Sequence, residues 1–140
     1  MKKLLFAGLV SLSMSSMANQ CNVHTWHDVV SKQGEWDVTL KVINQSGKFV
    51  DSNCSAFSKR GISEQKKLVY GFSFAQDADF DIAYTLTAVE KSPNSFQSKA
   101  CVFVITAKGP AQPDVNVLSY HGAQCDWQVV PGVGENFSVG

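Results

Sequence analysis

A His-x-x-His-Asp pattern near the N-terminus is the first place where this sequence suggests metal chemistry. His24, His27 and Asp28 carry imidazole and carboxylate groups, which are common protein ligands of transition metals. On a helical turn the three side chains could converge on one ion, and His121 could complete the set from a distant part of the chain. On a strand, His24 and Asp28 would share a face while His27 points away. We favour the alternative interpretation, which is surface histidines beside Trp26.

A run of alternating aspartates suggests a second cation site. Asp77, Asp79 and Asp81 are spaced as at the start of a calcium-binding loop. An EF-hand also needs a glycine at its sixth position and a glutamate at its twelfth, where this chain has Ile82 and Ala88. An EF-hand is therefore excluded, although a looser calcium site in the turn stays open. We favour a solvated turn whose charges discourage pairing at a sheet edge.

Catalytic motifs are missing from the sequence. It contains no Gly-x-Ser-x-Gly elbow, no His-Glu-x-x-His and no phosphate-binding glycine loop. A catalytic triad is defined by geometry, which spacing alone cannot supply. No pair of carboxylates stands out for glycoside hydrolysis either. We therefore predict a non-catalytic protein, and we assign no catalytic residue, no cofactor-binding residue and no cofactor.

Four cysteines indicate a disulfide framework. An even number of cysteines in an exported domain is typical of disulfides, and zinc is the weaker alternative because no Cys-x-x-Cys pair occurs. Cys21, Cys54, Cys101 and Cys125 allow three pairings. We prefer Cys21–Cys54 with Cys101–Cys125, because each bridge then closes within one half of the chain. Such loops would each contribute about 3–4 kcal/mol in the chain-entropy model.

The N-terminus has the three-part layout of a secretory signal. Lys2 and Lys3 precede a mostly apolar run over residues 4–14, and small residues then lead to a cleavage position after Ala18. The apolar run is too short for a membrane-spanning helix, which needs roughly 20 residues. The Met-Lys-Lys start is typical of bacterial export. We therefore predict a periplasmic or secreted protein with no membrane span after cleavage.

The remaining chain, residues 19–140, has the length of a single domain. The full sequence has 12 basic and 12 acidic residues, and loss of two signal lysines leaves 10 against 12, a net charge of −2. Arg60 is the sole arginine. Phosphate backbones are bound through clustered lysine and arginine, so nucleic acid is excluded as a partner. Two basic pairs, at 59–60 and 66–67, flank a polar stretch that we interpret as a solvated loop, with a protein-docking rim as the alternative.

Period-two alternation of apolar residues dominates the rest of the chain and predicts half-buried strands. The residues expected to face the core from three such strands are Trp36, Val38, Leu40 and Val42; Leu68, Tyr70, Phe72 and Phe74; and Phe80, Ile82, Tyr84, Leu86 and Ala88. The last two strands, near 67–75 and 80–88, are separated by a short polar break, which predicts a β-hairpin.

Further strands are expected towards the C-terminus. Residues 101–106 are apolar on both faces, which predicts a central strand covered on both sides. Two short strands flank Gly122, residues 137–139 are expected to add a short edge strand, and an early, less regular strand is expected near 23–30. Together these segments predict an all-β fold, a two-sheet β-sandwich that is immunoglobulin-like in the broad sense. It would have seven or eight short antiparallel strands and two disulfides.

The sequence thus favours a protein that acts through its surface. Trp26, Trp127 and Phe137 are candidate docking anchors, although Trp127 alternates with Cys125 and should face inward. The tail after Pro131 could add a strand to a partner's sheet.

The leading hypothesis is a non-catalytic interaction or structural module of the bacterial envelope, such as an accessory subunit of a larger secretion or surface assembly. Its partner would be another envelope or extracellular protein. Two alternatives stay open. One is a secreted protein that binds carbohydrate or a host surface. The other is a small metal-dependent enzyme that uses His24, His27 and Asp28.

Overall fold

The structure is a computed structural model that describes residues 21, 23, 26–44, 47–57, 59–74, 81–91, 97–108, 113–130 and 134–140. The expected signal segment, His24, Asp77 and Asp79 lie outside these residues. No helix in the described part of the chain is long and apolar enough to cross a membrane.

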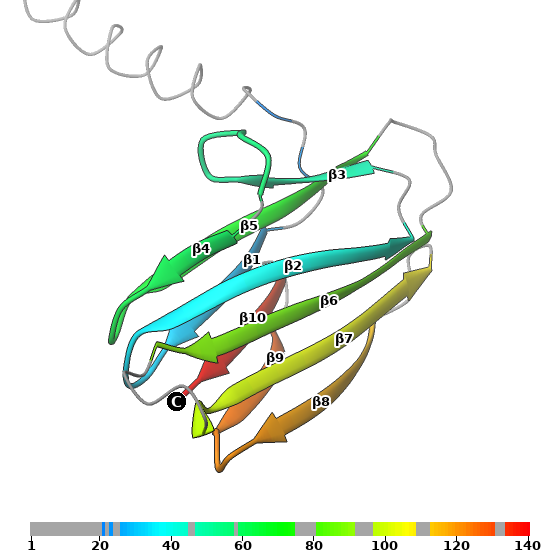
Figure 1. The fold of residues 1–140 in the computed structure, drawn as a ribbon. Helices are drawn as coiled ribbons and strands as arrows, with labels where there is room; N and C mark the ends of the chain where they lie inside the picture. Colours follow the sequence, from blue (N-terminus) through cyan, green and yellow to red (C-terminus); the bar gives the residue numbers. More distant parts are fainter. Residues whose placement is uncertain are drawn as a thin grey trace, which may run out of the picture.

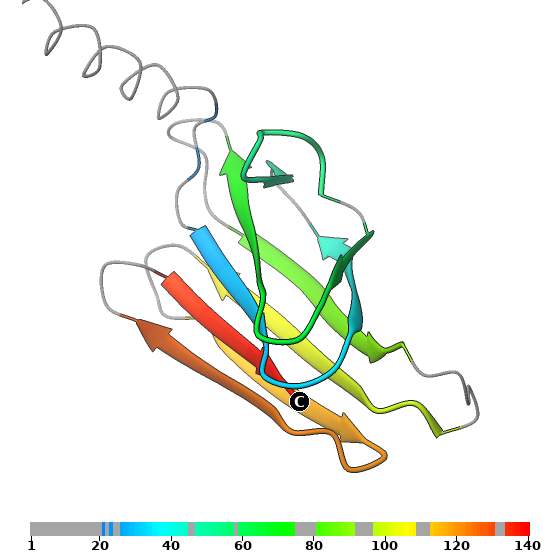
Figure 2. The same ribbon diagram turned by 90° about the vertical axis from the view of Figure 1, so that its left-hand side faces the viewer.

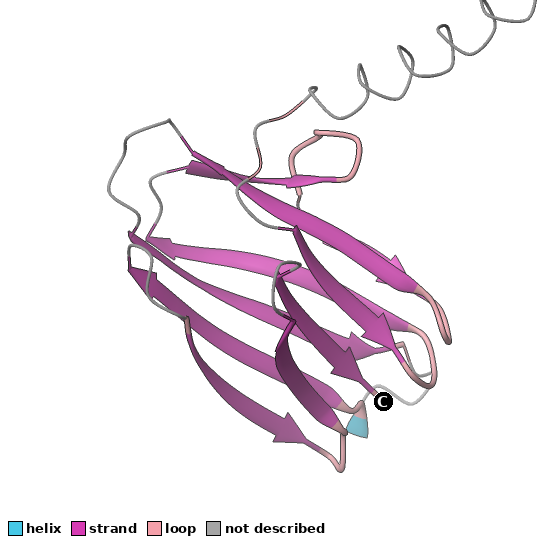
Figure 3. Cartoon of the chain, turned by 180° about the vertical axis from the view of Figure 1, so that it is seen from behind, coloured by secondary structure: helices cyan, strands magenta, loops and turns pink. Residues whose placement is uncertain are grey.

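The described chain forms two five-stranded sheets that pack face to face (Figure 1). Sheet A, which is seen from behind in Figure 3, has the strand order β3 (Gly47–Asp51), β5 (Lys67–Phe74), β1 (Trp26–Ser31), β10 (Gly134–Val139) and β9 (Cys125–Val130). Sheet B has the order β4 (Lys59–Ile62), β2 (Trp36–Asn44), β6 (Asp81–Glu90), β7 (Ala100–Lys108) and β8 (Asp114–Tyr120). The predicted all-β sandwich is confirmed, with ten strands in place of seven or eight.

The core lies between the sheets and is filled by the inward positions of the alternating strands. Trp36, Tyr70, Leu86 and Phe103 have no exposed surface, and in β6 alternate residues from Ile82 to Ala88 are buried. Leu40, Val42 and Leu68 are partly buried and pack against the same core. The inward faces predicted from period-two alternation are therefore confirmed for these strands. The reason is that alternate side chains of a strand point to opposite faces of its sheet.

The predicted hairpin between the strands near 67–75 and 80–88 is wrong. β5 pairs with β1 and β3 in sheet A, whereas β6 pairs with β2 and β7 in sheet B. The two strands face each other across the core, where the hydroxyl groups of Tyr70 and Tyr84 lie 2.8 Å apart. Alternation shows which face of a strand is buried, but it does not show which strands pair with its edges, because a strand of either sheet has the same alternating pattern.

The C-terminal strand is also placed differently from the prediction. β10 lies between β1 and β9, and it pairs with β1 in parallel orientation, so it is not an edge strand (Figure 2). Residues 134–139 already pair on both sides and cannot add a strand to a partner's sheet.

β7 lies inside sheet B, as expected, but it is not covered on both sides. Cys101, Phe103 and Ile105 are buried, whereas Val102 and Val104 on its outer face are only half-buried.

Both disulfides have the pairing preferred from the sequence. Cys101 on β7 is bonded to Cys125 on β9, with Cα atoms 5.6 Å apart, so this bridge joins the two sheets. Cys21 is bonded to Cys54 and ties the N-terminal segment to the loop after β3. No cysteine is free, so no thiolate is available as a nucleophile.

Gly71 on β5 is needed because Trp26 and Val23 pack directly on its Cα. Trp26 is its cross-strand partner, and a Cβ at this position would lie 2.9 Å from the Trp26 ring and closer still to Val23. We expect Gly71→Ala to lower the free energy of unfolding by about 1–3 kcal/mol through overpacking, as measured by urea denaturation. Ser73→Ala, on the same face of β5, is the matched control and should change it by less than about 0.5 kcal/mol. A Gly71→Ala protein that is more stable than the parent would contradict this account.

Candidate functional site

The two described members of the proposed metal site do not converge. His27 and Asp28 are consecutive residues of β1, so their side chains project to opposite faces of sheet A. Asp28 lies on the outer face, where its Oδ2 is 3.4 Å from Lys67 Nζ. His24 lies outside the described residues, and His121 is an exposed turn residue with φ 54°. Within the described ranges no group of three histidine, cysteine or acidic side chains could hold a metal ion.

His27 instead belongs to a polar cluster inside the sandwich, so its interpretation as a surface histidine is wrong. β1 and β5 place it opposite Tyr70, and the two rings stack with centroids 5.1 Å apart. Tyr70 reaches across the core to Tyr84 on β6, and their hydroxyl groups share the buried hydrogen bond. Glu135 points inward from β10, beside His27. The cluster therefore joins strands of both sheets.

The ionisable pair in this cluster is held at unusual pKa values by burial. His27 Nδ1 lies 3.5 Å from Glu135 Oε2, and neither atom has a hydrogen-bond partner among the described residues. Desolvation lowers the pKa of His27 to about 4, against a smaller opposite effect of Asp28, and raises the pKa of Glu135 to about 7. Burial also raises the pKa of Tyr70 and of Tyr84. Near pH 6 the pair is therefore a neutral imidazole beside a protonated carboxyl.

Perturbed pairs of this kind occur in active sites, and this one lies largely inside the core. The side chains of His27 and Glu135 are only 13% and 7% exposed. The pocket described below contains neither residue. Glu135 was missed from the sequence because alternation was recognised only over 137–139. Its signal was an inward position two residues before the buried Phe137.

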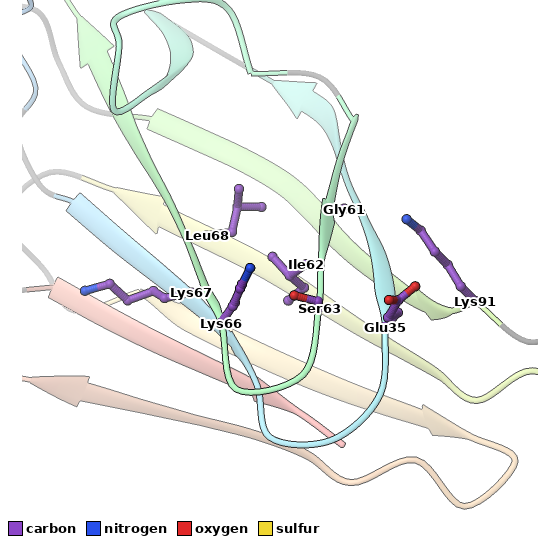
Figure 4. A pocket seen from close by; sticks show the side chains of 8 residues that line it. All are labelled: Glu35, Gly61, Ile62, Ser63, Lys66, Lys67, Leu68 and Lys91. Carbon is purple, nitrogen blue, oxygen red and sulfur yellow. The ribbon is translucent and has the colours of Figure 1, made fainter.

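A pocket of about 320 Å³ opens where the β4–β5 turn meets the start of β2 (Figure 4). It is lined by Glu35, Gly61, Ile62, Ser63, Lys66, Lys67, Leu68 and Lys91. The basic character of this lining is largely neutralised by neighbours outside it. Lys67 is paired with Asp28, and Lys91 Nζ lies 3.4 Å from Asp37 Oδ1. In Figure 4 Lys67 points away from the other lining side chains. The pocket thus lacks a converging set of polar groups that would orient a ligand.

The first basic pair of the sequence is engaged in ion pairs on β4. Lys59 Nζ lies 3.5 Å from Asp37 Oδ2, and Arg60 donates a hydrogen bond of 3.0 Å to Asp51 Oδ2. Asp51 also accepts hydrogen bonds from the backbone N–H groups of Asn53 and Ser55. The hydrogen bond from Arg60 is the main cause that lowers the pKa of Asp51, and the two backbone hydrogen bonds lower it further. These charges hold β4 and the loop after β3 together, which fits a structural role.

Two of the three aromatic residues considered as docking anchors are turned towards the core. Phe137 is fully buried, which contradicts its interpretation as an exposed anchor. Trp127 packs against the core, as its alternation with Cys125 predicted. Trp26 lies on the outer face of sheet A, half-buried against Gly71.

Exposed apolar side chains instead gather on the outer face of sheet B. Pairing places Val89, Ala100 and Tyr120 in one cross-strand row, and Val102 beside Leu118 in the next. Val89, Leu118 and Tyr120 are 39%, 48% and 47% exposed. We call this surface the β8 face, and it comprises Val89, Ala100, Val102, Val104, Leu118 and Tyr120.

The other half of the same outer face carries charged residues, although Ile43 on β2 is also exposed there, at 62%. On β2, Asp37 and Lys41 occupy the outward positions that continue the rows of the β8 face. Asp37 is bracketed by Lys59 and Lys91 at 3.5 and 3.4 Å. An apolar centre bounded on one side by charged residues is the usual composition of a protein-docking surface. The apolar half could not be recognised from the sequence, because both the outward and the inward residues of β7 are apolar and the whole strand was therefore interpreted as buried.

β8 adds a free sheet edge to this face. Among the described strands it pairs only with β7, and it is the last strand of sheet B. Figure 1 shows it along the lower margin of the front sheet. Alternate backbone N–H and C=O groups of such a strand point away from the sheet and can pair with another chain.

No family model matches this chain, and no curated protein sequence matches it. Among solved structures the chain is similar to IP-1A from Alcaligenes faecalis, with 7% sequence identity and a TM-score of 0.56. The similarity covers 82% of this chain and 88% of IP-1A. At this identity the similarity supports the fold alone.

Proposed function

We propose that this chain is a non-catalytic, exported interaction module of the bacterial envelope whose β8 face binds another envelope or extracellular protein. The observation that carries the proposal is the group of half-exposed apolar side chains on three adjacent strands, β6, β7 and β8, with Leu118 and Tyr120 on the edge strand. Exposed apolar patches of this kind mark interaction sites on soluble proteins. A rigid sandwich stapled by two disulfides suits this role, because little conformational entropy is lost on binding.

Two features support export. Both disulfides are consistent with an oxidising compartment, and the first eighteen residues have the layout of a cleavable signal. Mass measurement of protein purified from the native envelope should show a chain that begins at Asn19 and carries two disulfides. A chain that retains residues 1–18, or four free thiols, would contradict export.

The binding proposal is tested by crosslinking in intact cells. Val89 is on the β8 face but two strands away from the free edge. A photoreactive amino acid at this position should give one crosslinked product of reproducible molecular mass that contains a different protein. The same probe at Lys41, on the charged half of sheet B, is the matched control and should give no such product.

A charge variant completes this test. Val102→Lys, at the centre of the face, is expected to reduce the crosslink from Val89 by at least about tenfold, because binding would bury the lysine without a partner. Equal crosslinking from Val89 and Lys41, or a crosslink that survives Val102→Lys, would contradict the proposal.

A further inference from the structure

We infer that the free edge of β8 pairs with the β8 strand of a second copy of this chain, so that two sandwiches form one continuous ten-stranded sheet. The inference rests on the proposed function, because the paired edge borders the β8 face. It adds one named partner, a second copy of this chain. In such a dimer the β8 faces of both copies would merge across a twofold axis. The partner surface available to other proteins would thereby double.

β8 lacks the protection found at two of the other three sheet edges, β4 and β3. β4 carries Lys59 and Arg60. The edge of β3 is covered by a bridge between Val50 and Ala56. Natural proteins guard free edges by such charges and covering segments, because unguarded edges pair with other strands.

The fourth edge, β9, is as little guarded as β8, because it carries one aspartate and no lysine or arginine. Asp126 on β9 is paired with Lys32 at 3.9 Å. β8 has the sequence Asp-Val-Asn-Val-Leu-Ser-Tyr, in which Asp114 at the first position is the sole charge. Neither strand contains lysine or arginine, but β8 is longer, with 7 residues against 6, and exposes two large apolar side chains, Leu118 and Tyr120, where β9 exposes Val129. Pairing would therefore bury more apolar surface at the β8 edge than at the β9 edge.

β8 can also pair with the β8 of a second copy without bringing like charges together. In antiparallel pairing centred on Val117, Asn116 of each copy lies opposite Leu118 of the other, and Asp114 lies opposite Tyr120. No like charges face each other. Val117 packs against the core of its own sandwich, so the inner faces of both copies also continue without a break. Without the signal segment the chain has 10 basic and 12 acidic residues, so its net charge is only −2 and long-range repulsion between copies is small.

Sedimentation velocity of the purified mature protein tests the inference. The parent protein should sediment as a dimer at micromolar concentration. Asn116→Lys/Leu118→Lys places two lysines opposite two lysines and should weaken dimerisation by about 100-fold or more. Asn116→Glu/Leu118→Glu should do the same. An equimolar mixture of the two double variants should recover the dimer, because each lysine then faces a glutamate.

Matched controls separate dimerisation from folding. Both substituted side chains are exposed, so the far-UV circular dichroism and thermal unfolding of each variant monomer should match those of the parent. Val129→Lys on the β9 edge, where the side chain is 38% exposed, should leave the dimer intact.

A monomeric parent, or double variants that still dimerise, would overturn the inference, as would a lysine–glutamate mixture that stays monomeric. The crosslink from Val89 to a different protein is measured separately. Failure of the dimer is therefore distinguishable from failure of the proposed function.

Discussion

Glu135→Gln is expected to make the stability of the fold strongly dependent on pH. In that variant His27 keeps a folded-state pKa near 4, because burial is its main cause, while its unfolded-state pKa is 6.5. The unfolded chain then binds more protons than the folded chain, so the free energy of unfolding increases as pH rises from 4 to 6.5. The expected increase is about 3 kcal/mol, from 1.36 kcal/mol per pKa unit.

His27→Gln is expected to give the opposite dependence. Glu135 then remains, with a folded-state pKa of about 7 and an unfolded-state value of 4.5. The folded chain now binds more protons, so the free energy of unfolding should fall by about 3 kcal/mol as pH rises from 4.5 to 7. In the parent protein the pH dependences due to His27 and Glu135 oppose each other. Near pH 5.5 the two side chains together bind about one proton in the folded state and about one in the unfolded state. The parent should therefore show little pH dependence from this pair between pH 4.5 and 6.5.

Urea denaturation at a series of pH values measures both effects. The double variant His27→Gln/Glu135→Gln is the control and should be as insensitive to pH as the parent, since no titrating group of the pair remains. If the free energy of unfolding changes with pH in opposite directions in the two single variants, with the same m-value in urea, the pKa shifts of His27 and Glu135 are supported. Slopes of the same sign would show that burial does not govern both groups.

Cys101→Ala/Cys125→Ala is expected to be the most destabilising change to the covalent framework. The bridge spans 24 residues, which corresponds to about 3.5 kcal/mol of loop entropy in the unfolded chain. Cys101 is fully buried, so its truncation also removes packing in the core. The total loss should therefore approach 4–5 kcal/mol, which is a large part of the usual 5–15 kcal/mol stability of a domain.

The second disulfide provides the matched comparison. Cys21→Ala/Cys54→Ala removes a bridge of similar span, 33 residues, so the entropy model alone predicts nearly the same loss. The structure predicts a smaller one, because this bridge holds an N-terminal segment and a loop that can detach without opening the core. Thermal and urea unfolding of both double variants would decide the question. Equal losses would indicate that loop entropy alone matters.

Much of the fold could be predicted from local patterns. The alternation from Trp36 to Val42 and from Ile82 to Ala88 predicted which side chains are buried, because burial of a strand has a period of two residues. The disulfide pairing was also preferred correctly. Strand partners were predicted poorly, as the assumed hairpin of β5 and β6 and the assumed C-terminal edge strand show. Partner choice depends on contacts between residues far apart in the chain, and a local pattern holds little information about these.

The candidate sites divide in the same way. His27 and Asp28 were noticed because of their residue types, yet β1 sends them to opposite faces of sheet A. Glu135 and the β8 face were missed, because each becomes visible only when strands from different parts of the chain lie side by side.

The sequence by itself determined the all-β class and the inward side of each strong strand, because these depend on spacing within one segment. It also determined the four cysteines that staple the domain. Only the tertiary structure decided which strands meet, that a histidine and a glutamate share the core, and that β8 ends a sheet. Those features arise from the alignment of segments many residues apart, which is set by the packing of the whole domain.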